Sequence, residues 1–351
     1  MLETLIKQLA AAQSLAEAQV HSAVELLADE KIPAASKAEF LIALAQKGET
    51  PGEIAAFARA LCEKSVPLPI ENDWRHSREI LDIVGTGGDR LGTFNISTTS
   101  AIVCAAAGVA VAKHGNRAVT SQAGSADVLE ALGIRIDLTP EEAARSLREK
   151  NFAFFFAPNF HPAFKHIAPA RKLCAERGQR TIFNFLGPLL NPARPSAMLV
   201  GVPRAELCEP LARVLQSLGV RRGMVVTGKI GNRQSAIGNY IDELSTLGEN
   251  TIAEFYHERC FTTSVLSPEE FPLQPATLDD LLGGDKFQNA EITRRILRGD
   301  ERGPKRDAVL LNAGAALFVA GKTKSLAEGW DLAGETIDSG KADGKLAELA
   351  S

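Results

Sequence analysis

The sequence is poor in cysteine, in long apolar runs and in positive charge, and each shortage excludes a class of protein. The five cysteines are dispersed without a Cys-x-x-Cys pair, which argues against a disulfide framework or a structural zinc site and suits a reducing compartment. The formal net charge of the 351 residues is −4, so bulk charge does not favour nucleic acid or an anionic membrane as a partner. No apolar run approaches the roughly 20 residues needed to span a bilayer.

The beginning of the chain and two familiar nucleotide motifs narrow the possibilities further. Residues 1–4 lack a basic stretch with an apolar segment behind it, so we expect a soluble, cytoplasmic protein. The glycine-rich turn at 85–88 is not followed by Gly-Lys-Ser or Gly-Lys-Thr at the spacing of a Walker loop, and it does not fit Gly-x-Gly-x-x-Gly. Neither a P-loop nucleotidase nor a dinucleotide enzyme is therefore the leading interpretation.

The sequence does contain a series of polar, glycine-rich clusters between residues 82 and 127. The first, Gly-Thr-Gly-Gly-Asp at 85–89, follows an apolar run at 80–84 and leads into a hydroxyl-rich segment at 92–98. Its glycines allow the backbone to turn and to bring N–H groups within reach of an anion. A glycine-rich turn alone is more often a plain chain reversal, so the prediction of a phosphate site depends on the clusters that follow.

A helix expected over residues 97–107 adds a second anion-binding element. Ser97, Thr98 and Thr99 are candidate caps, and Gly108 is the expected stop. A helix that begins there directs free N–H groups and the positive end of its dipole toward the glycine-rich turn.

Two further clusters complete the predicted phosphate surface. A short apolar run at 109–112 leads to Lys113, His114 and Arg117 at the carboxyl end of a buried strand, where open α/β sheets bind ligands. We expect these three side chains to face the same anion. The segment 124–127, Gly-Ser-Ala-Asp, opens one more helix and supplies another N-terminus.

The chain as a whole predicts a helical lobe followed by an α/β lobe. Helix start signals occur early, as Ser-x-x-Glu at 14–17 and 36–39 and as Thr-Pro-x-Glu at 50–53. The proline-rich segment 66–70 interrupts helix and is the expected connection between lobes. From residue 79 on, helices alternate with strand-length apolar runs, which is typical of a largely parallel sheet covered by helices. The expected strands are residues 80–84, 109–112, 152–157, 197–202 and 223–227.

At these clusters the chain resembles the anthranilate phosphoribosyltransferase family. The family carries Gly-Thr-Gly-Gly-Asp, Asn-Ile-Ser-Thr, Lys-His-Gly-Asn-Arg and Gly-Ser-Ala-Asp-x-Leu-Glu-Ala-Leu-Gly in this order. The chain has all four, at residues 85–89, 95–98, 113–117 and 124–133. The resemblance covers nearly the whole chain and continues at residues 161–163, 181–184, 186–192 and 242–243.

The resemblance implies an α/β class protein with the nucleoside-phosphorylase-like phosphoribosyltransferase fold, a small helical lobe plus a large α/β lobe with a mostly parallel central sheet. We expect the helical lobe to comprise residues 1–68 with a contribution from about 165–192, and the α/β lobe, which binds phosphoribosyl pyrophosphate, to comprise 69–351. The implied reaction transfers phosphoribose from phosphoribosyl pyrophosphate to the amine of anthranilate and releases pyrophosphate, in tryptophan biosynthesis.

The resemblance also implies Mg²⁺ as cofactor and a homodimer joined through the helical lobe. We expect apolar stripes on the N-terminal helices, such as Leu5 with Leu9 and Val24 with Leu27, to support the association. The expected partners are therefore the two substrates and a second copy of the chain, with no nucleic acid and no membrane.

The same resemblance assigns the site residues. No residue is expected to be an essential general base, because the amine is already a neutral nucleophile, and Lys113, His114 and Asn116 position the substrates. The metal ligands are Ser97, Asp242 and Glu243. The anthranilate site comprises Gly85, Asn116, His161, Arg171 and Gly187, with His114 nearby. The phosphoribosyl pyrophosphate site comprises Gly85, Gly88, Asp89, Thr93, Asn95, Ile96, Ser97, Thr98, Lys113, His114, Gly115, Asn116, Arg117, Ala118, Val119, Thr120, Ser121 and Ser125.

The chemistry of these residues fits such a transfer. Displacement at the anomeric carbon leaves a highly charged pyrophosphate, so catalysis depends on stabilising that charge and positioning the nucleophile. Neighbouring strand residues point to opposite faces, so Asp242 and Glu243 can serve one metal ion only if the backbone turns or water intervenes. From spacing alone, an exposed acidic pair on a loop would be the preferred interpretation.

The acceptor site contains the one departure from the family pattern. Arg171 suits a carboxylate because guanidinium pairs with it in a bidentate fork, although without the resemblance a solvated basic face with Lys172 would be preferred. The segment between Arg171 and Arg180 is slightly longer than the usual family segment. Arg177 or Arg180 could therefore approach the acid instead.

Three other functions compete with this prediction. A pyrimidine-nucleoside phosphorylase shares the implied fold, but its Lys-His-Ser-Thr-Gly-Gly signature differs from Lys-His-Gly-Asn-Arg at 113–117. A catalytically silent relative that binds nucleic acid would predict a basic groove and lost substrate residues. A phosphoribosyltransferase for another aromatic amine is the nearest rival, because nothing in the sequence measures the acceptor pocket.

Overall fold

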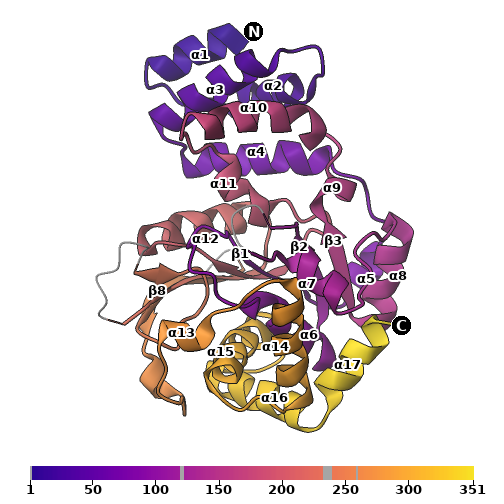
Figure 1. Ribbon diagram of the computed structural model, residues 1–351. Coiled ribbons are helices and arrows are strands. Elements are labelled where there is room, and N and C mark those ends of the chain that lie inside the picture. The colour runs from indigo at the N-terminus through magenta and orange to yellow at the C-terminus, as the bar shows by residue number, and fades with distance from the viewer. Residues whose placement is uncertain (1, 119–121, 232–238, 258–259) are drawn as a thin grey trace.

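The computed structural model describes residues 2–118, 122–231, 239–257 and 260–351 and places a helical lobe on a larger α/β lobe (Figure 1). α10 packs against α2 and α3, so a segment from the middle of the chain completes the helical lobe. The boundary of the lobes at residue 68 stays a prediction. The helices of this lobe are α1 (Leu2–Ala10), α2 (Glu17–Ala28), α3 (Ala34–Lys47), α4 (Pro51–Glu63), α10 (Phe164–Glu176) and α11 (Phe183–Leu186).

The α/β lobe is organised around a mixed sheet with the strand order β3-β2-β1-β4-β5-β7-β8, and β6 pairs with β5. Strands β1 to β5 are parallel to one another, whereas β6 and β7 pair antiparallel with β5, and β8 pairs antiparallel with β7. The expected strands are all present, and the prediction of a mostly parallel sheet is confirmed. The strands are β1 (Ile80–Gly85), β2 (Ala110–Gly115), β3 (Phe152–Phe156), β4 (Ala197–Gly201), β5 (Arg222–Lys229), β6 (Tyr240–Ile241), β7 (Asn250–Tyr256) and β8 (Cys260–Leu266).

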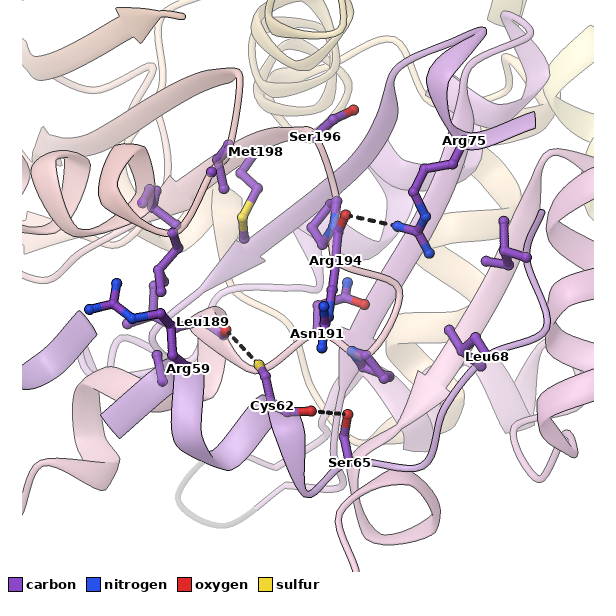
Figure 2. A pocket seen from close by; sticks show the side chains of 18 of the residues that line it. Arg59, Cys62, Ser65, Leu68, Arg75, Leu189, Asn191, Arg194, Ser196 and Met198 are labelled. Atoms are coloured by element: carbon purple, nitrogen blue, oxygen red, sulfur yellow. Dashed lines mark hydrogen bonds between the residues drawn. The ribbon is translucent and has the colours of Figure 1, made fainter. Parts of the chain in front are cut away.

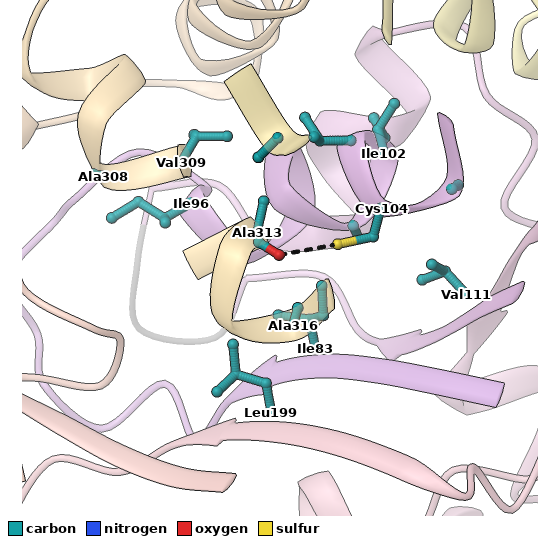
Figure 3. Close-up of a cluster of buried hydrophobic side chains, with 14 of the residues drawn as sticks. Ile83, Ile96, Ile102, Cys104, Val111, Leu199, Ala308, Val309, Ala313 and Ala316 are labelled. Carbon is teal, nitrogen blue, oxygen red and sulfur yellow. Dashed lines mark hydrogen bonds between the residues drawn. The ribbon is translucent and has the colours of Figure 1, made fainter. Parts of the chain in front are cut away.

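Helices cover both faces of this sheet. Val225 of β5 packs in the cluster that contains α12, while its neighbours Met224 and Val226 pack on the other face with α6 and α15. Figure 3 shows that second face, where small residues such as Ala313 let α15 approach α6 so closely that the Cys104 thiol reaches the Ala313 carbonyl oxygen at 3.6 Å. α6 is therefore packed closely between α15 and the sheet.

The remaining helices pack around the sheet and make up most of the C-terminal part of the chain. In the described residues no helix is long and apolar enough to cross a membrane. The elements are α5 (Asn72–His76), α6 (Ile96–Ala106), α7 (Ser125–Ala131), α8 (Pro140–Lys150), α9 (Ala157–Phe160), η1 (Gly187–Leu189), η2 (Ala205–Leu207), α12 (Cys208–Ser217), η3 (Pro268–Glu270), α13 (Leu278–Leu281), α14 (Lys286–Arg298), α15 (Pro304–Val319), α16 (Leu326–Asp338) and α17 (Lys341–Leu349).

Two of the predicted helix starts are wrong. α2 begins three residues after Ser14, because the Gln19 side chain accepts from the Ala16 N–H at 2.9 Å and closes the first turn there. α3 begins at Ala34, before Ser36, because Pro33 is extended at a ψ of 140° and serves as the N-cap residue. The Thr50 capping box is confirmed, since its hydroxyl accepts from the Glu53 N–H at 3.2 Å.

The predicted cap of α6 is also wrong. The N-cap is Asn95, and Ser97, Thr98 and Thr99 lie inside the first turn. Thr99 donates its hydroxyl proton to the Asn95 carbonyl oxygen at 3.0 Å, so it closes the turn from within. The Ser97 hydroxyl is consequently left to serve another group, described below.

Candidate active site

The glycine-rich turn after β1 wraps around a carboxylate from a distant part of the chain. The Asp242 Oδ2 atom accepts from the Gly87 N–H at 2.5 Å, and the Gly88 N–H and the Thr86 hydroxyl lie 3.4 Å from the same oxygen. A turn that presents several donors to one oxygen is an anion-binding concavity. The N–H groups of the turn therefore converge on one oxygen as expected, but that oxygen belongs to Asp242, and phosphate binding at the turn stays a prediction.

The segment that carries this carboxylate is held by close backbone contact. A Cβ atom at Gly85 would lie 3.0 Å from Asp242 Oδ2, and one at Gly201 would lie 1.5 Å from the Asp242 carbonyl oxygen. These two glycines end the paired strands β1 and β4 opposite one another. Glycine is therefore required at position 201, whereas at position 85 a Cβ atom would press on Asp242 and shift it slightly.

The acidic residues next to the turn strongly perturb one another. Burial, followed by the nearby Asp89 and Glu243 carboxylates, raises the pKa of Asp242 well above its ordinary value. Burial raises the pKa of Glu243 to about 7, against the opposing effects of Lys113 and of hydrogen bonds from the Ser97 N–H and hydroxyl. Asp242 and Glu243 thus occupy one region, as the metal prediction requires, because the chain turns directly after β6.

The α6 N-terminus supplies the donors of this acidic cluster. Ser97 binds Glu243 through both its backbone N–H and its hydroxyl, so the positive end of α6 already faces negative charge. In the described part of the chain, no group of three or more His, Cys, Asp or Glu is arranged to hold a metal ion. Mg²⁺ in phosphate sites commonly uses one or two carboxylates, waters and substrate oxygens.

Lys113 and Arg117 do not converge on one anion, contrary to expectation. Lys113 is buried, and its ammonium donates to the Ile83 carbonyl oxygen at 2.7 Å and lies 3.5 Å from the Ser97 hydroxyl. Burial lowers its pKa, and the Asp82 and Glu243 carboxylates oppose that effect. Lys113 therefore lies beside the α6 N-terminus as predicted.

Arg117 is directed elsewhere by two acidic side chains. Its guanidinium pairs with Asp127 at 2.9 Å and with Glu130 at 3.1 Å. The second Asp127 oxygen accepts from the backbone N–H groups of Ala118 and Gly124, each at 3.0 Å. Asp127 thereby fixes the start of α7 and the end of the Lys-His-Gly-Asn-Arg motif as one unit.

His114 turns away from the phosphate side and faces the predicted acceptor side. Its Nδ1 atom lies 3.2 Å from the Gly187 carbonyl oxygen, and its ring centroid lies 5.3 Å from that of His161, edge to face. Burial lowers the pKa of His114 to about 3, with His161 adding to the effect, and burial lowers the pKa of His161 to about 4. Both rings are neutral at physiological pH.

In the described structure, the Nε2 atoms of His114 and His161 are hydrogen-bond acceptors that receive no donor. Because the Nδ1 of His114 donates to Gly187, its Nε2 is an unprotonated acceptor, and the hydrogen bond from His161 to the Leu190 carbonyl assigns the same tautomer to His161. The Nε2 atoms of both rings are buried without a hydrogen-bond partner in the described structure. Buried polar atoms are normally satisfied, so this pair indicates a site for N–H donors.

A row of rings connects these histidines to Arg171. Phe164 stacks on His161 with centroids 5.2 Å apart, and Phe183 meets Phe164 edge-on at 5.7 Å. The Arg171 guanidinium carbon lies 5.0 Å from the centre of the Phe183 ring. Residues of the longer segment after Arg171 extend α10 by a turn, up to Glu176.

The other predicted residues of the Lys-His-Gly-Asn-Arg cluster lie at the mouth of this site. Asn116 is exposed, and its carbonyl oxygen accepts from the Ser125 hydroxyl at 3.4 Å. Gly115 is required there, because a Cβ atom would lie 2.2 Å from the Ser125 Oγ. The predicted residues Val119, Thr120 and Ser121 lie outside the described residues.

Comparison with known proteins identifies the family. Residues 77–343 match the model described as "Glycosyl transferase family, a/b domain", and residues 3–65 match "Glycosyl transferase family, helical bundle domain". The anthranilate phosphoribosyltransferase of Petrotoga mobilis is 46% identical over 349 residues, which cover 99% of this chain and 96% of the relative. That of Symbiobacterium thermophilum is 47% identical over 342 residues, covering 97% and 94%. The chain belongs to the anthranilate phosphoribosyltransferase family.

Solved structures of anthranilate phosphoribosyltransferases share the whole fold. The crystal structure of the Thermus thermophilus protein matches with a TM-score of 0.86 and 44% identity, covering 99% of this chain and 98% of that one. The Saccharomyces cerevisiae protein in complex with PRPP and Mg matches with a TM-score of 0.84 and 27% identity, covering 99% and 96%. The same yeast protein in complex with 4-fluoroanthranilate has a TM-score of 0.83 at 26% identity, covering 100% and 98%. The predicted family and fold class are confirmed.

Three features of the anthranilate phosphoribosyltransferase site were missed by the sequence analysis. Buried Asn289 of α14 donates to the Asn95 side chain at 3.0 Å and accepts from the Gly284 N–H at 2.7 Å, so it ties the hydroxyl-rich segment to the C-terminal half. Asn191 donates to Asp82 at 2.8 Å beneath the histidines. Phe164 lines the acceptor side. Sequence offered no signal for Asn289 or Phe164, whereas Asn191 belongs to the matched segment at 186–192.

The neutral histidines predict a pH dependence of stability. A buried histidine with a folded pKa near 4 binds fewer protons than the unfolded chain, whose histidine titrates near 6.5, so the free energy of unfolding falls as pH drops from about 6.5. For His161 we expect a loss of about 2 kcal/mol between pH 7.5 and pH 5. Urea unfolding of the protein and of His161→Gln at both pH values measures it, and the variant should lose less. An identical loss in both would contradict the pKa of His161.

Proposed function

We propose that the protein transfers phosphoribose from phosphoribosyl pyrophosphate to anthranilate, giving phosphoribosylanthranilate and pyrophosphate in tryptophan biosynthesis. The observation that carries the proposal is the adjacency of two sites of opposite character. The glycine-rich turn and the α6 N-terminus present donors to anionic oxygens, and the two neutral histidines next to them present acceptors to an N–H group.

The donor side has the features needed to stabilise a leaving pyrophosphate. Charge develops on the leaving oxygens during the transfer, and fixed donors aimed at that charge stabilise the transition state without reorganisation. The N–H groups at Gly87 and Gly88 and the Ser97 hydroxyl are such donors, although in this structure they bind the Asp242 and Glu243 carboxyl groups, so a bound pyrophosphate would have to share or take over these contacts. Lys113 adds a cation beside Ser97, held by the Ile83 carbonyl so that it cannot swing into solvent.

Mg²⁺ fits the acidic residues of this site. Burial raises the pKa of Asp242 and of Glu243, and the neighbouring Asp89 carboxyl group adds to the effect on both. A divalent cation offsets the repulsion among these carboxyl groups and, when bound, supplies charge neutralisation for the pyrophosphate oxygens. Asp242, Glu243 and the Ser97 hydroxyl would hold it, with waters and substrate oxygens completing the shell.

The acceptor side has the features needed for an aromatic amine with a carboxylate. The Nε2 atoms of His114 and His161 accept N–H groups and so orient an amine without protonating it, because both rings are neutral. An uncharged amine is the nucleophilic form. Phe164 supplies an apolar ring beside them, and Arg171 lies at the end of the same row as a carboxylate partner.

The proposal is tested by assay of the purified protein with both substrates and Mg²⁺. We expect formation of phosphoribosylanthranilate and an equal amount of pyrophosphate. A panel of other aromatic amines, with and without an ortho carboxylate, tests the nearest rival function. Turnover of another amine in preference to anthranilate would replace the proposed acceptor, and no turnover with any amine would refute the proposal.

The role of Arg171 as the partner of the anthranilate carboxylate can be tested separately from the phosphoribosyl pyrophosphate site. If Arg171 pairs with the acceptor carboxylate, Arg171→Ala removes a charge-assisted hydrogen bond and should raise the KM for anthranilate roughly ten- to a hundredfold. The KM for phosphoribosyl pyrophosphate should hardly change. Steady-state kinetics with each substrate varied in turn measure both.

Matched variants distinguish Arg171 from its neighbours. Lys113→Ala should show the opposite pattern, with the phosphoribosyl pyrophosphate dependence affected more. Arg177→Ala and Arg180→Ala change exposed arginines beyond α10 and should leave both KM values unchanged. If Arg171→Ala leaves the anthranilate kinetics unchanged and Arg177→Ala or Arg180→Ala impairs them, the carboxylate partner is that neighbouring arginine and not Arg171.

A cytoplasmic homodimer joined through the helical lobe is also part of the proposal. Leu5, Leu9, Val24 and Leu27, which we expected to support association, are buried within the single chain instead. The support is therefore the family resemblance alone. Multi-angle light scattering should give twice the 37.5 kDa chain mass. A monomer at micromolar concentration would contradict the dimer.

A further inference from the structure

A cavity of about 790 Å³ lies where the helical lobe meets the α/β lobe, apart from the candidate active site (Figure 2). It is bounded by α4, the connecting segment 65–76, the segment 188–198 and the end of α12. None of the residues of the glycine-rich turn, the acidic cluster or the histidine pair lines it. The volume is within the range of roughly 300 to 1,000 Å³ that is typical of small-molecule sites.

Two of the arginines that line this cavity have no acidic partner. Arg59 pairs with Glu17 and Arg221 with Glu79, each at 2.9 Å. Arg75 and Arg194 form no ion pair with any acidic residue of the described chain. Arg75 instead donates to the carbonyl oxygens of Ala193 at 2.5 Å and of Arg194 at 3.2 Å.

These two guanidinium groups are held near one another in spite of their repulsion. Burial lowers the pKa of Arg75, and the charge of Arg194 lowers it further. In the view of Figure 2, Arg194 lies between Arg75 and the side chains of Met198 and Leu189. Glu63 also lines the cavity, but in the described residues its ion pair is with His21 at 3.6 Å and not with either arginine. Two guanidinium groups on one wall, neither of them paired with an acid, suit a bidentate anion.

The backbone at Arg194 is strained in the same place. Its φ of 46° lies in the left-handed region that non-glycine residues rarely adopt. The conformation is imposed by Asn191, whose side chain accepts from the Ala193 N–H at 2.9 Å while it donates to buried Asp82. Such strain persists where surrounding structure enforces it, and it often marks a binding site.

Part of the wall is apolar and indicates an organic ligand. Leu68, Met198, Leu215 and Val220 line the cavity together with polar residues such as Ser65 and Asn191. A simple inorganic anion would leave this surface in contact with water. An anion with an apolar body covers it and gains the free energy of burial.

We propose that this cavity binds a small organic anion, with a carboxylate or phosphate group between Arg75 and Arg194 and an apolar body against Met198 and Leu68. The site is separate from the one that performs the proposed transfer. Because Asn191 connects the Arg194 turn to Asp82, and Asp82 accepts from the His114 N–H at 3.4 Å, the ligand also contacts the framework behind the acceptor site.

Methyl NMR gives a local test. The chain has three methionines; Met198 lines the cavity, and Met224 packs on the opposite face of the sheet. We expect phenyl phosphate, added to protein labelled with [¹³C]methyl methionine, to shift the Met198 signal saturably and to leave Met224 in place. Met198→Leu assigns the signal. Benzoate should give the same shift if a carboxylate suffices, and the tighter of the two probes identifies the head group.

Two variants and one control decide the role of the arginines. Arg194→Gly removes the guanidinium and suits the left-handed backbone, so it should fold and weaken binding roughly ten- to a hundredfold. Arg75→Gln should weaken binding similarly. Arg298→Ala is the control, because it removes the same charge from α14, where Arg298 lies 3.7 Å from Asp343. This variant should bind phenyl phosphate with the affinity of the parent protein.

Three outcomes would overturn the proposal. They are equal affinity in Arg194→Gly and the parent, equal affinity for benzyl alcohol and phenyl phosphate, and equal affinity for inorganic phosphate and phenyl phosphate. The readout does not depend on turnover. Protein that fails to make phosphoribosylanthranilate can still show the Met198 shift, so the two proposals fail separately.

Discussion

Asp242→Asn combined with Glu243→Gln should reduce kcat at least roughly a hundredfold, since a bound divalent cation typically supplies several kcal/mol and each tenfold corresponds to about 1.4 kcal/mol. The fold should be unaffected or slightly stabilised. Both carboxyl groups have raised pKa values, so the free energy of unfolding of the protein falls as pH rises and these groups ionise. The amide side chains of the variant do not ionise, so the variant does not have that loss. Steady-state assays at saturating Mg²⁺ and thermal unfolding measure the two effects.

Glu249→Gln is the matched control for this double variant. Glu249 lies on the same segment of the chain, is exposed and pairs with Lys229 at 2.7 Å on the surface. Its removal should change neither turnover nor the dependence on Mg²⁺. Near-normal turnover of the double variant would assign Asp242 and Glu243 a purely structural role.

Gly201→Ala should be as damaging as the loss of the acids themselves, although the residue bears no functional group. The new Cβ atom would lie 1.5 Å from the carbonyl oxygen and 2.3 Å from the carbonyl carbon of Asp242, and a backbone clash cannot be relieved by a side-chain rotation. Asp242 must move by an ångström or more, and displacements of that size cost about a hundredfold in activity. We expect such a loss of kcat/KM with the helical content retained by circular dichroism.

Gly344→Ala controls for the loss of a glycine. Gly344 lies inside α17, and no atom would approach a Cβ there within 4 Å. Alanine should leave activity unchanged and raise stability by roughly 0.5–1 kcal/mol. If Gly201→Ala retained full activity, Asp242 would be free to adjust, and its fixed position could not be part of catalysis.

The local signals in the sequence predicted the parallel half of the sheet, because β1, β2, β4 and β5 are buried on both faces and read as continuous apolar runs. β8 was missed. The side chains of β8 are mostly exposed and rich in threonine and serine, so neither an apolar run nor a strict alternation marks this strand. The antiparallel edge depends on pairing with β7, and pairing is a property of the assembled sheet.

For the site, sequence motifs located the groups but not their directions. Three potentially cationic residues of the Lys-His-Gly-Asn-Arg motif have three different environments. Lys113 lies at the α6 N-terminus, His114 at the acceptor side, and Arg117 against Asp127. Strand alternation separates the first two, and the acidic partner of the third is recruited from α7. Such partners become visible only in three dimensions.

The position of α10 in the helical lobe has a consequence for biosynthesis of the chain. Lys37 is buried only because its ammonium donates to the His166 carbonyl oxygen at 2.9 Å, and Ile167 and Cys174 fill the core that the first four helices share. While the ribosome is still making β1, β2 and β3, these four helices have an open apolar face. The amino-terminal lobe can therefore be completed only after α10 has been synthesised, and until then the four helices expose apolar surface of the kind that favours aggregation.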